Sequence, residues 1–207
     1  MADNKKTYPI FVFDFGGVLL DWNPRHLYRK LFNGDSVAME NFLAEISFVE
    51  WNLEQDKGRP FAKGIAELSQ RFPHYAAFIN AYDERWEESI AGPIPDTVEI
   101  LHLLKQKGHA LFGLSNWSSE TFNRIRSKYD FLHWFDWIMI SGEIKLAKPD
   151  PGIYNILLDR ANESAEKCLF IDDSEVNITA AKELGFMTIH FKSPQQLKRD
   201  LSRRGLL

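Results

Sequence analysis

The stretch FVFDFGGVLLDW, residues 11–22, places one carboxylate, Asp14, directly after a short apolar run. Two glycines, Gly16 and Gly17, follow almost at once, and glycine allows the backbone to turn tightly. We expect residues 10–14 to form a buried strand that ends in the acid. Such a position needs an explanation, because ionised carboxylates are rarely buried without a partner.

Four further apolar runs resemble this first one in length. They lack strict alternation of polar and apolar residues, which is typical of strands buried on both faces of a parallel sheet. Segments with helical patterns lie between the later runs, and Asp96 is the expected N-cap of the first of them. The alternation of strand and helix predicts an α/β fold with a Rossmann-like, doubly wound parallel sheet. The expected strands are 10–14, 110–115, 137–141, 168–172 and 187–191, and the expected helices are 96–107, 118–128, 150–161 and 174–184.

Residues 24–91 break this rhythm, because they contain apolar residues at helical spacing and no convincing strand. We interpret this segment as a helical-bundle cap that is inserted between the first two strands and covers the carboxyl edge of the sheet. The predicted domains are therefore an α/β core, residues 1–20 and 92–207, and a cap, residues 21–91. Within the cap, the polar segment 54–60 is predicted to be a loop tip that reaches the active site. The expected cap helices are 24–32, 37–46, 60–72 and 75–90.

Composition excludes several classes of protein. The 207 residues carry a formal net charge of −4, which argues against a general nucleic-acid binder. No apolar run approaches the ~20 residues of a membrane span, and the polar residues 1–9 lack the apolar segment of a signal peptide. The single cysteine, Cys168, lies in an apolar run and is expected to be a buried packing residue. We expect a cytoplasmic monomer or homodimer with no membrane or nucleic-acid partner.

Polar side chains gather where the predicted strands end. In open α/β sheets, ligands bind outside the carboxyl ends of the strands. Asp14 follows the first strand, and the pairs Ser115-Asn116 and Asp172-Asp173 follow two others. Lys148 lies in a loop after the 137–141 strand. Each residue has a simpler interpretation as a helix cap or a solvated loop charge, but that interpretation would have to hold at every strand end at once.

These residue types form a coherent chemical set. Neighbouring carboxylates repel each other unless a positive charge lies between them. Carboxylate, carbonyl and water oxygens are the ligands of Mg²⁺, and a substrate phosphate commonly completes its shell. Lys148 and the Ser115 hydroxyl are suited to hold the other oxygens of a phosphoryl group. Asp14 would then attack phosphorus, since carboxylates act as covalent nucleophiles and form aspartyl-phosphate.

Four short motifs, DFGGVLLDW, LSN, KP and FIDDSEVNITAAKELG, occur in this order along the chain. Together they resemble the four motifs of the haloacid dehalogenase-like hydrolase superfamily, in its branch of phosphatases with a small helical cap. The chain is similar in this respect to bacterial sugar-phosphate phosphatases that act on glucose 1-phosphate. The resemblance implies that Asp14 is the nucleophile and Lys148 the lysine that neutralises charge. It also implies that Ser115 and Asn116 bind phosphate.

The same resemblance implies a magnesium site. The metal site would consist of Asp14, the backbone carbonyl of Gly16, Asp172 and Asp173, with Asp172 beside the ligand Asp173. Haloacid dehalogenases of the superfamily work without a metal and carry Ser-Ser-Asn where this chain has Asp172-Asp173-Ser174. The retained acid pair favours a metal-dependent phosphatase for a small phosphorylated metabolite. The alternatives are a metal-independent 2-haloacid dehalogenase and a catalytically weak binding or regulatory module.

One position departs from the phosphatase pattern. Phosphatases of this superfamily usually carry a second Asp two residues after the nucleophile, which protonates the leaving oxygen and later activates water. Here that position is Gly16. General acid–base help is worth roughly 10²–10⁴-fold. The enzyme therefore either favours good leaving groups, such as anomeric phosphates, or uses an acid from the cap. By residue type, the candidates are Asp21, His26, Glu50 and Glu54.

Two Trp-Asn pairs lie in the predicted cap, and an aromatic face beside an amide is a common way to hold a sugar ring. Trp22 and Asn23 stand where the chain enters the cap, and we interpret them as substrate-binding residues. Trp51 and Asn52 form the second pair, for which core packing of the tryptophan is the favoured interpretation. Trp117, next to Asn116, is a further candidate wall of the site.

Overall fold

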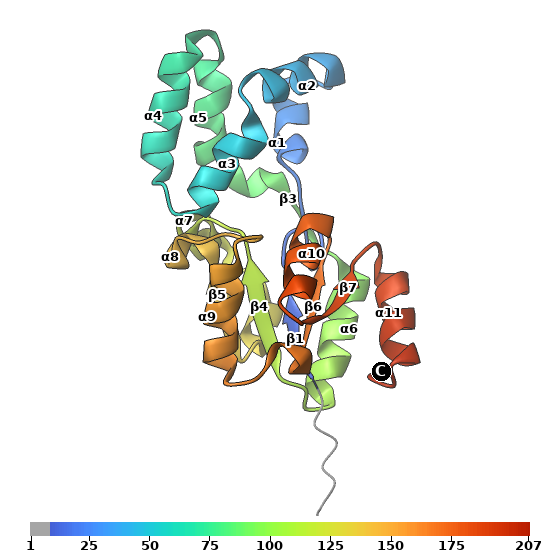
Figure 1. The fold of residues 1–207 in the computed structure, drawn as a ribbon. Helices are drawn as coiled ribbons and strands as arrows, with labels where there is room; N and C mark the ends of the chain where they lie inside the picture. Colours follow the sequence, from blue (N-terminus) through green and yellow to red (C-terminus); the bar gives the residue numbers. More distant parts are fainter. Residues whose placement is uncertain (1–8) are drawn as a thin grey trace, which may run out of the picture.

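A five-stranded parallel sheet forms the centre of the protein, in a computed structural model that describes residues 9–207 (Figure 1). The strand order is β5-β4-β1-β6-β7, so β1 lies in the middle and pairs with both β4 and β6. All five predicted strands are confirmed, each within one residue at either end. Their bounds are β1 Ile10–Phe13, β4 Leu111–Ser115, β5 Trp137–Ile140, β6 Cys168–Asp172 and β7 Met187–His190.

Helices cover both faces of this sheet, which explains why its strands are apolar on both sides. Successive side chains of a strand point to opposite faces. Phe11 and Phe13 accordingly belong to one apolar cluster, with residues of α6 (Pro95–Gln106), α7 (Ser119–Ile125) and α11 (Pro194–Arg203). Val12 belongs to the other cluster. That cluster includes residues of α9 (Pro151–Ala161) and α10 (Glu175–Glu183), and also Cys168, which is fully buried as predicted.

Two boundaries of the core helices differ from the prediction. Asp96 is not the N-cap of α6, because the helix already begins at Pro95 and Ile94 takes the cap position. Proline suits the first helical position, where its missing N–H and fixed φ cost nothing. The helix predicted over 118–128 is shorter, since α7 ends at Ile125. A short helix, α8 (Ser141–Ile144), follows β5.

The inserted helices stand above the carboxyl end of the sheet (Figure 1). Four of them were predicted, although the last ends at Glu84 and a 3₁₀ turn over Trp86–Ser89 follows it. Aromatic rings form their common core, with Tyr28 and Phe42 4.9 Å apart and Phe48 and Tyr82 5.0 Å apart between ring centroids. The bounds of these helices are α1 Pro24–Leu31, α2 Ser36–Glu45, α4 Phe61–Arg71 and α5 Ala76–Glu84.

Three elements around the insertion were not predicted. Helix α3 spans Phe48–Asp56, so the loop predicted over 54–60 is wrong for its first three residues. A two-stranded antiparallel ribbon of β2 (Leu20–Trp22) and β3 (Ile90–Pro93) carries the chain into and out of the insertion. The expectation of no strand within 24–91 therefore fails at Ile90 and Ala91. Both predicted domain boundaries fall inside this ribbon, and the division into two domains stays a prediction.

No helix within residues 9–207 is long and apolar enough to cross a membrane. Residues 1–8, which form most of the polar N-terminal stretch considered above, lie outside the described residues.

Candidate active site

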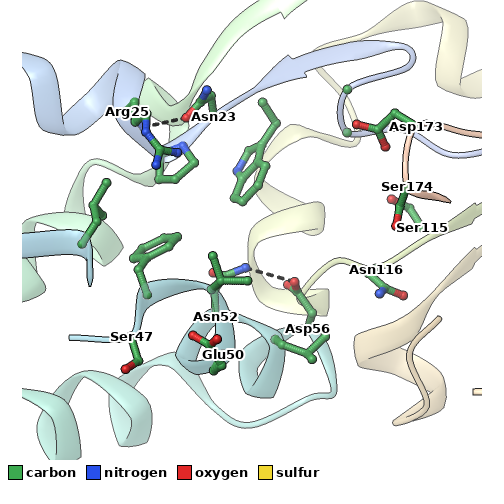
Figure 2. Close-up of a pocket in the computed structure, with 18 of the residues that line it drawn as sticks. Asn23, Arg25, Ser47, Glu50, Asn52, Asp56, Ser115, Asn116, Asp173 and Ser174 are labelled. Atoms are coloured by element: carbon green, nitrogen blue, oxygen red, sulfur yellow. Dashed lines mark hydrogen bonds between the residues drawn. The ribbon is translucent and has the colours of Figure 1, made fainter. Parts of the chain in front are cut away.

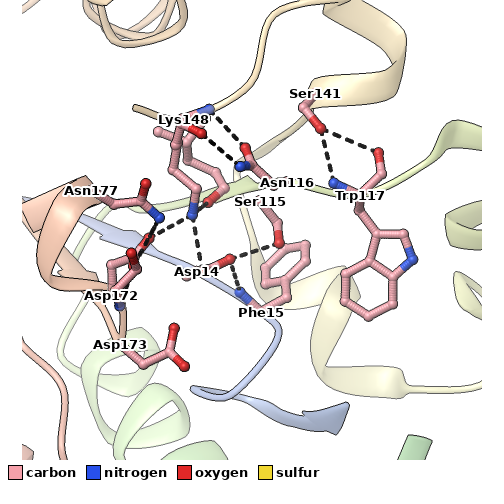
Figure 3. A network of polar contacts seen from close by, with 12 residues as sticks. Asp14, Phe15, Ser115, Asn116, Trp117, Ser141, Lys148, Asp172, Asp173 and Asn177 are labelled. Atoms are coloured by element: carbon pink, nitrogen blue, oxygen red, sulfur yellow. Dashed lines mark hydrogen bonds and ion pairs between the residues drawn. The ribbon is translucent and has the colours of Figure 1, made fainter. Parts of the chain in front are cut away.

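Three carboxylates converge at the carboxyl edge of the sheet, as predicted (Figure 3). Asp14 follows β1, Asp172 is the last residue of the neighbouring strand β6, and Asp173 comes next. One oxygen from each carboxylate lies within 4.8 Å of the others. The pairing of β1 with β6 brings these acids together across more than 150 residues of sequence.

Lys148 provides the positive charge between two of these acids. Its Nζ lies 3.0 Å from Asp14 Oδ2 and 2.6 Å from Asp172 Oδ2, and it donates a third bond to the backbone oxygen of Leu114. The side chain is fully buried, so all three donors of the ammonium group have protein acceptors. Burial lowers the pKa of Lys148, but the charges of Asp14 and Asp172 outweigh it and hold the pKa above its usual value.

Asp14 is held rigidly on the side of its other oxygen. The backbone N–H of Phe15 and the hydroxyl of Ser115 donate to Asp14 Oδ1, at 2.7 and 2.6 Å. Burial raises the pKa of Asp14 to about 7, an effect that Lys148 and Ser115 oppose and the neighbouring acids reinforce. This value holds for the protein without a cation, and a bound cation favours the ionised carboxylate. An anion fixed in this way is oriented for attack on an electrophile.

Asp172 is oriented by partners that the sequence motifs did not single out. Asn177, on α10, donates from Nδ2 to both carboxylate oxygens of Asp172 at 3.1 Å, and the backbone N–H of Ser174 donates to Oδ1 at 2.8 Å. The sequence hinted at this role of Asn177 only through its spacing from Asp172, since a residue in the first turn of a helix faces back towards the end of the preceding strand. Asp173 is exposed and carries no comparable restraint among the described residues.

The two glycines after Asp14 have different structural roles. Gly17 has φ +73°, which is strained for any other residue, and a Cβ there would lie 2.3 Å from Asp173 Oδ2, so the Asp173 carboxylate would have to move. Gly16 has no positive φ, and the atom nearest to a Cβ added there would be Trp22 Cβ, at 4.0 Å. Backbone strain and lack of space therefore explain Gly17 but not Gly16.

Ser115 and Asn116 lie at the end of β4, next to Asp14. The Asn116 side chain forms a reciprocal pair with the backbone of Lys148, donating to its carbonyl and accepting from its N–H, both at 2.8 Å. One role of Asn116 is therefore to hold the Lys148 loop against β4. The phosphate-binding roles of Ser115 and Asn116 stay predictions.

A cavity of about 800 Å³ opens between the carboxylates and the cap helices (Figure 2). Trp22 and Asn23 line it, and their contact with a substrate stays a prediction. Asn23 also caps α1, since its side chain accepts from the Arg25 N–H at 3.0 Å. Much of the lining is apolar and comes from α1, α2 and α3. The apolar lining residues are Trp22, Pro24, Leu43, Ala44, Phe48, Val49 and Leu53.

The other predicted wall residues are largely structural. Trp51 is buried, and its Nε1 donates to the Gly64 carbonyl at 3.2 Å, which agrees with the packing interpretation. Asn52 lines the cavity, but Tyr82 and Asp56 occupy its polar atoms. Trp117 is buried beside a small second cavity of about 50 Å³.

The structure separates the four candidates for the missing acid. Asp21 and His26 pair with each other at 3.0 Å and line neither cavity. Glu54 pairs with Lys57 and also lies outside both. Glu50 lines the large cavity.

Asp56 is an acid that the sequence reasoning missed. It lines both the large and the small cavity, and Gly16 and Asn116 line both as well. The sequence could have pointed to Asp56, because this acid lies two residues before Gly58 and within the segment that was predicted to reach the site.

The donor set suits a hard divalent cation. Three carboxylates within 4.8 Å offer the oxygen ligands that Mg²⁺ prefers, and few protein ligands are typical when substrate oxygens complete its shell. Asp14, Asp173 and the Gly16 carbonyl would be ligands, with Asp172 positioned beside them. Lys148 balances only part of the charge of this cluster.

A model of the haloacid dehalogenase-like hydrolase family matches residues 8–185. The phosphorylated carbohydrates phosphatase of Thermotoga maritima is 25% identical over 86% of this chain and 82% of its own length. The sesquiterpene phosphatase astK of Aspergillus oryzae is 26% identical over 89% of this chain and 90% of its own. A haloacid dehalogenase-like enzyme from Bacteroides thetaiotaomicron, solved with magnesium and inorganic phosphate, superimposes with a TM-score of 0.68 at 25% identity, over 89% of this chain and 94% of that one. Dehalogenases also occur among the relatives.

Proposed function

Because the chain belongs to the haloacid dehalogenase-like hydrolase family, we propose that it is a Mg²⁺-dependent phosphatase that acts through an aspartyl-phosphate on Asp14. The observation that carries this proposal is the buried Asp14–Lys148–Asp172 arrangement with Asp173 at its open side. It combines a fixed nucleophile with a fixed positive charge and a set of oxygen ligands. Relatives that are phosphatases of small phosphorylated compounds support it.

In this proposal the protein's own groups orient the reaction. Bound Mg²⁺ would supply positive charge that draws the phosphate to the carboxylates and offsets their repulsion. Ser115 and the Phe15 amide hold Asp14 Oδ1, which leaves Oδ2, beside Lys148, to form the bond to phosphorus. Lys148 stays protonated and stabilises the anionic phosphoryl group as it is transferred.

The substrate is proposed to be a small phosphorylated metabolite, with a sugar phosphate as one candidate. The cavity of about 800 Å³ has room for the alcohol part of such an ester. Asn23 and Glu50 offer polar contacts there, and Trp22 offers an aromatic face. The cytoplasmic location and the monomeric or homodimeric state stay predictions.

The two alternatives make different demands on the site. A metal-independent dehalogenase has no use for the acid pair Asp172-Asp173, which would add uncompensated negative charge. A binding or regulatory module would not depend on Asp14 as a nucleophile. The acid cluster and its fixed lysine favour the phosphatase over both.

A screen of phosphorylated metabolites and an aryl phosphate tests the proposal. We expect release of inorganic phosphate with Mg²⁺, and loss of this activity when the metal is chelated. Asp14→Asn should abolish hydrolysis while the fold, measured by circular dichroism, is retained. Equal hydrolysis by Asp14→Asn would refute the mechanism, and halide release from 2-haloacids in the presence of a chelator would support the dehalogenase instead.

A further inference from the structure

The position that lacks the expected proton donor is structurally able to carry one. Gly16 does not have a positive φ, and a Cβ added there would make only an ordinary van der Waals contact, with Trp22 Cβ at 4.0 Å. Its missing side chain is therefore not a requirement of the backbone. Hydrolysis of an ordinary alkyl phosphate still needs a proton for the leaving oxygen, so another group near Gly16 has to supply it.

Asp56 is suitably placed for this task. It is the last residue of α3, and both it and Gly16 line the large cavity that contains Asp14. Asp56 and Gly16 also line the smaller cavity next to it, together with Asn116. Figure 2 shows Asp56 on the cap side of the cavity, with its carboxyl bonded to Asn52 and with Asn116 and Ser115 on the core side. It thus approaches the site from the side where the alcohol part of a substrate would lie.

Several contacts fix the position of Asp56. Asn52, one helical turn earlier, donates from Nδ2 to Asp56 Oδ2 at 3.0 Å. The hydroxyl of Ser141, a core residue, donates to the Asp56 backbone carbonyl. Two residues later, Gly58 has φ +94° and lies so close to Gly142 that a Cβ would be 2.8 Å from its carbonyl oxygen. The end of α3 is therefore held directly against the core beside the catalytic groups.

The surroundings of Asp56 also raise its pKa, so that protonated and ionised forms are both populated at neutral pH. Burial raises its pKa to about 7, and the backbone N–H of Ser118 opposes this shift. Within residues 9–207, no basic side chain pairs with Asp56. A carboxyl group near neutrality is suited to both donating and accepting a proton. The other titratable groups that line the same two cavities are Asp14, Arg25, Glu40, Glu50, Tyr82 and Asp173.

We propose that Asp56 is the general acid and base of this enzyme, in place of the absent side chain at position 16. The proposal rests on the phosphatase function proposed above. In the first step, Asp14 forms a bond to phosphorus while the ester P–O bond breaks, and Asp56 gives its proton to the leaving alcohol oxygen. In the second step, the Asp56 carboxylate takes a proton from the water that attacks the aspartyl-phosphate, which releases phosphate and frees Asp14.

The test compares two esters in one variant. Asp56→Asn keeps the size of the side chain but cannot transfer the proton. For an alkyl phosphate, whose leaving group needs protonation, we expect turnover to fall by ~10²–10⁴-fold. For p-nitrophenyl phosphate, whose leaving group needs none, the first step should stay within about 3-fold of wild type and appear as a burst of nitrophenol. Because the second step lacks its base, the phosphorylated enzyme should then accumulate and be detected by mass spectrometry.

Two further variants separate chemistry from structure. Glu54→Gln removes an exposed acid of the same helix that lines neither cavity, and both esters should react as with wild type. Asp56→Asn combined with Gly16→Asp places a carboxyl group at position 16, where a Cβ makes no close contact, and alkyl phosphate turnover should recover at least 10-fold. If Asp56→Asn does not fold by circular dichroism, Asp56→Ser replaces it in the same comparison.

The outcomes are distinct. Alkyl phosphate turnover by Asp56→Asn within 3-fold of wild type, or a failure of the phosphorylated enzyme to accumulate with the aryl ester, would overturn the role of Asp56 and leave the proposed phosphatase function intact. A uniform loss on both esters, without a burst, would also overturn it and indicate a structural role. Wild-type protein that hydrolyses neither ester with Mg²⁺ would refute the phosphatase function, and the role of Asp56 with it.

Discussion

The residues of the site owe their arrangement to charge balance. Asp14 and Asp172 are buried acids, and the fully buried ammonium group of Lys148 lies between them. A charge is buried in a protein only when paired and hydrogen-bonded. The sequence indicated this set because its members occur at strand ends. It did not reveal that Asn177 orients Asp172 or that Asn116 holds the backbone of Lys148, because such contacts depend on the direction of individual side chains.

Replacing Lys148 should destabilise the fold, because Asp14 and Asp172 would then be buried without a positive partner. For Lys148→Met, which keeps much of the apolar volume, we expect the free energy of unfolding to fall by about 3–5 kcal/mol, because the carboxylates lose their shared partner. Urea denaturation in the presence of a chelator measures this. The double variant Lys148→Met, Asp172→Asn should recover part of the loss. Equal stability of wild type and Lys148→Met would contradict the charge-balance account.

Asp56 should make stability depend on pH. Its pKa is about 7 in the folded protein, against 3.8 for an ordinary Asp, so the folded state holds the proton more tightly than the unfolded state. Its contribution is fully present below about pH 4 and is lost as the pH rises to 7. The variant Asp56→Asn cannot ionise at this position, so it should not lose stability in this way as the pH rises.

We therefore expect Asp56→Asn to gain stability relative to wild type between pH 4 and pH 8, by roughly 1–4 kcal/mol at ~1.4 kcal/mol per unit of pKa difference. Urea denaturation of both proteins at several pH values, with a chelator present, checks the sign. A difference that does not change with pH would show that Asp56 has an ordinary pKa.

Among the elements, helix α3 forms much of the contact between the cap and the core, and it is the one α-helix of the insertion that the sequence pattern did not predict. Its inward face includes the polar residues Asn52 and Gln55 beside Phe48 and Trp51, so the apolar periodicity is broken. Gln55 is fully buried and donates to the Trp51 carbonyl at 2.7 Å. A helix whose buried face is partly polar gives a weak periodic signal, and such faces are common where a helix contributes to a site. The ribbon of β2 and β3 was missed for a different reason, since each strand has only three or four residues.

The turn after α3 offers a test at this scale. Gly58→Ala places a side chain at φ +94° and 2.8 Å from the Gly142 carbonyl oxygen, so the turn has to move away from the core. We expect a loss of about 1–3 kcal/mol in stability and at least a 10-fold fall in alkyl phosphate turnover, because Asp56 shifts with the turn.

Gly34→Ala is the matched control. Gly34 also has a positive φ, +85°, but no described atom lies within 4 Å of the position that a Cβ would take. This variant should lose stability through backbone strain alone and keep its turnover. A similar loss of turnover in both variants, or in neither, would argue against a specific role for the contact between Gly58 and Gly142.

For the whole molecule, the sequence was most informative about elements that are buried on all sides, because burial constrains residue type most strongly. Strands buried on both faces leave continuous apolar runs, which is why all five core strands were predicted within one residue. The order of the motifs and the insertion after β1 followed from the same runs. Contacts between the insertion and the core could not be predicted, because they join segments such as Asp56 and Ser141 that no local pattern connects.

Binding of Mg²⁺ should stabilise the whole fold. A ligand that binds only the folded state adds ~2.7 kcal/mol at 100 times its Kd. We expect saturating Mg²⁺ to raise the Tm of wild type and not that of Asp173→Asn, whose cluster loses a ligand on its open side. Thermal unfolding of both proteins with Mg²⁺ and with a chelator measures the effect. An equal rise in both would place the cation elsewhere.

Trapping the covalent intermediate tests the central claim most directly. Wild-type protein is mixed with an aryl phosphate and Mg²⁺, quenched in acid within the first turnover, and digested for mass spectrometry. We expect a phosphoryl group on the peptide that contains Asp14, and none in Asp14→Asn or when the metal is chelated. Steady release of phosphate with no phosphorylated peptide at any quench time, or a phosphoryl group on another residue, would contradict the account.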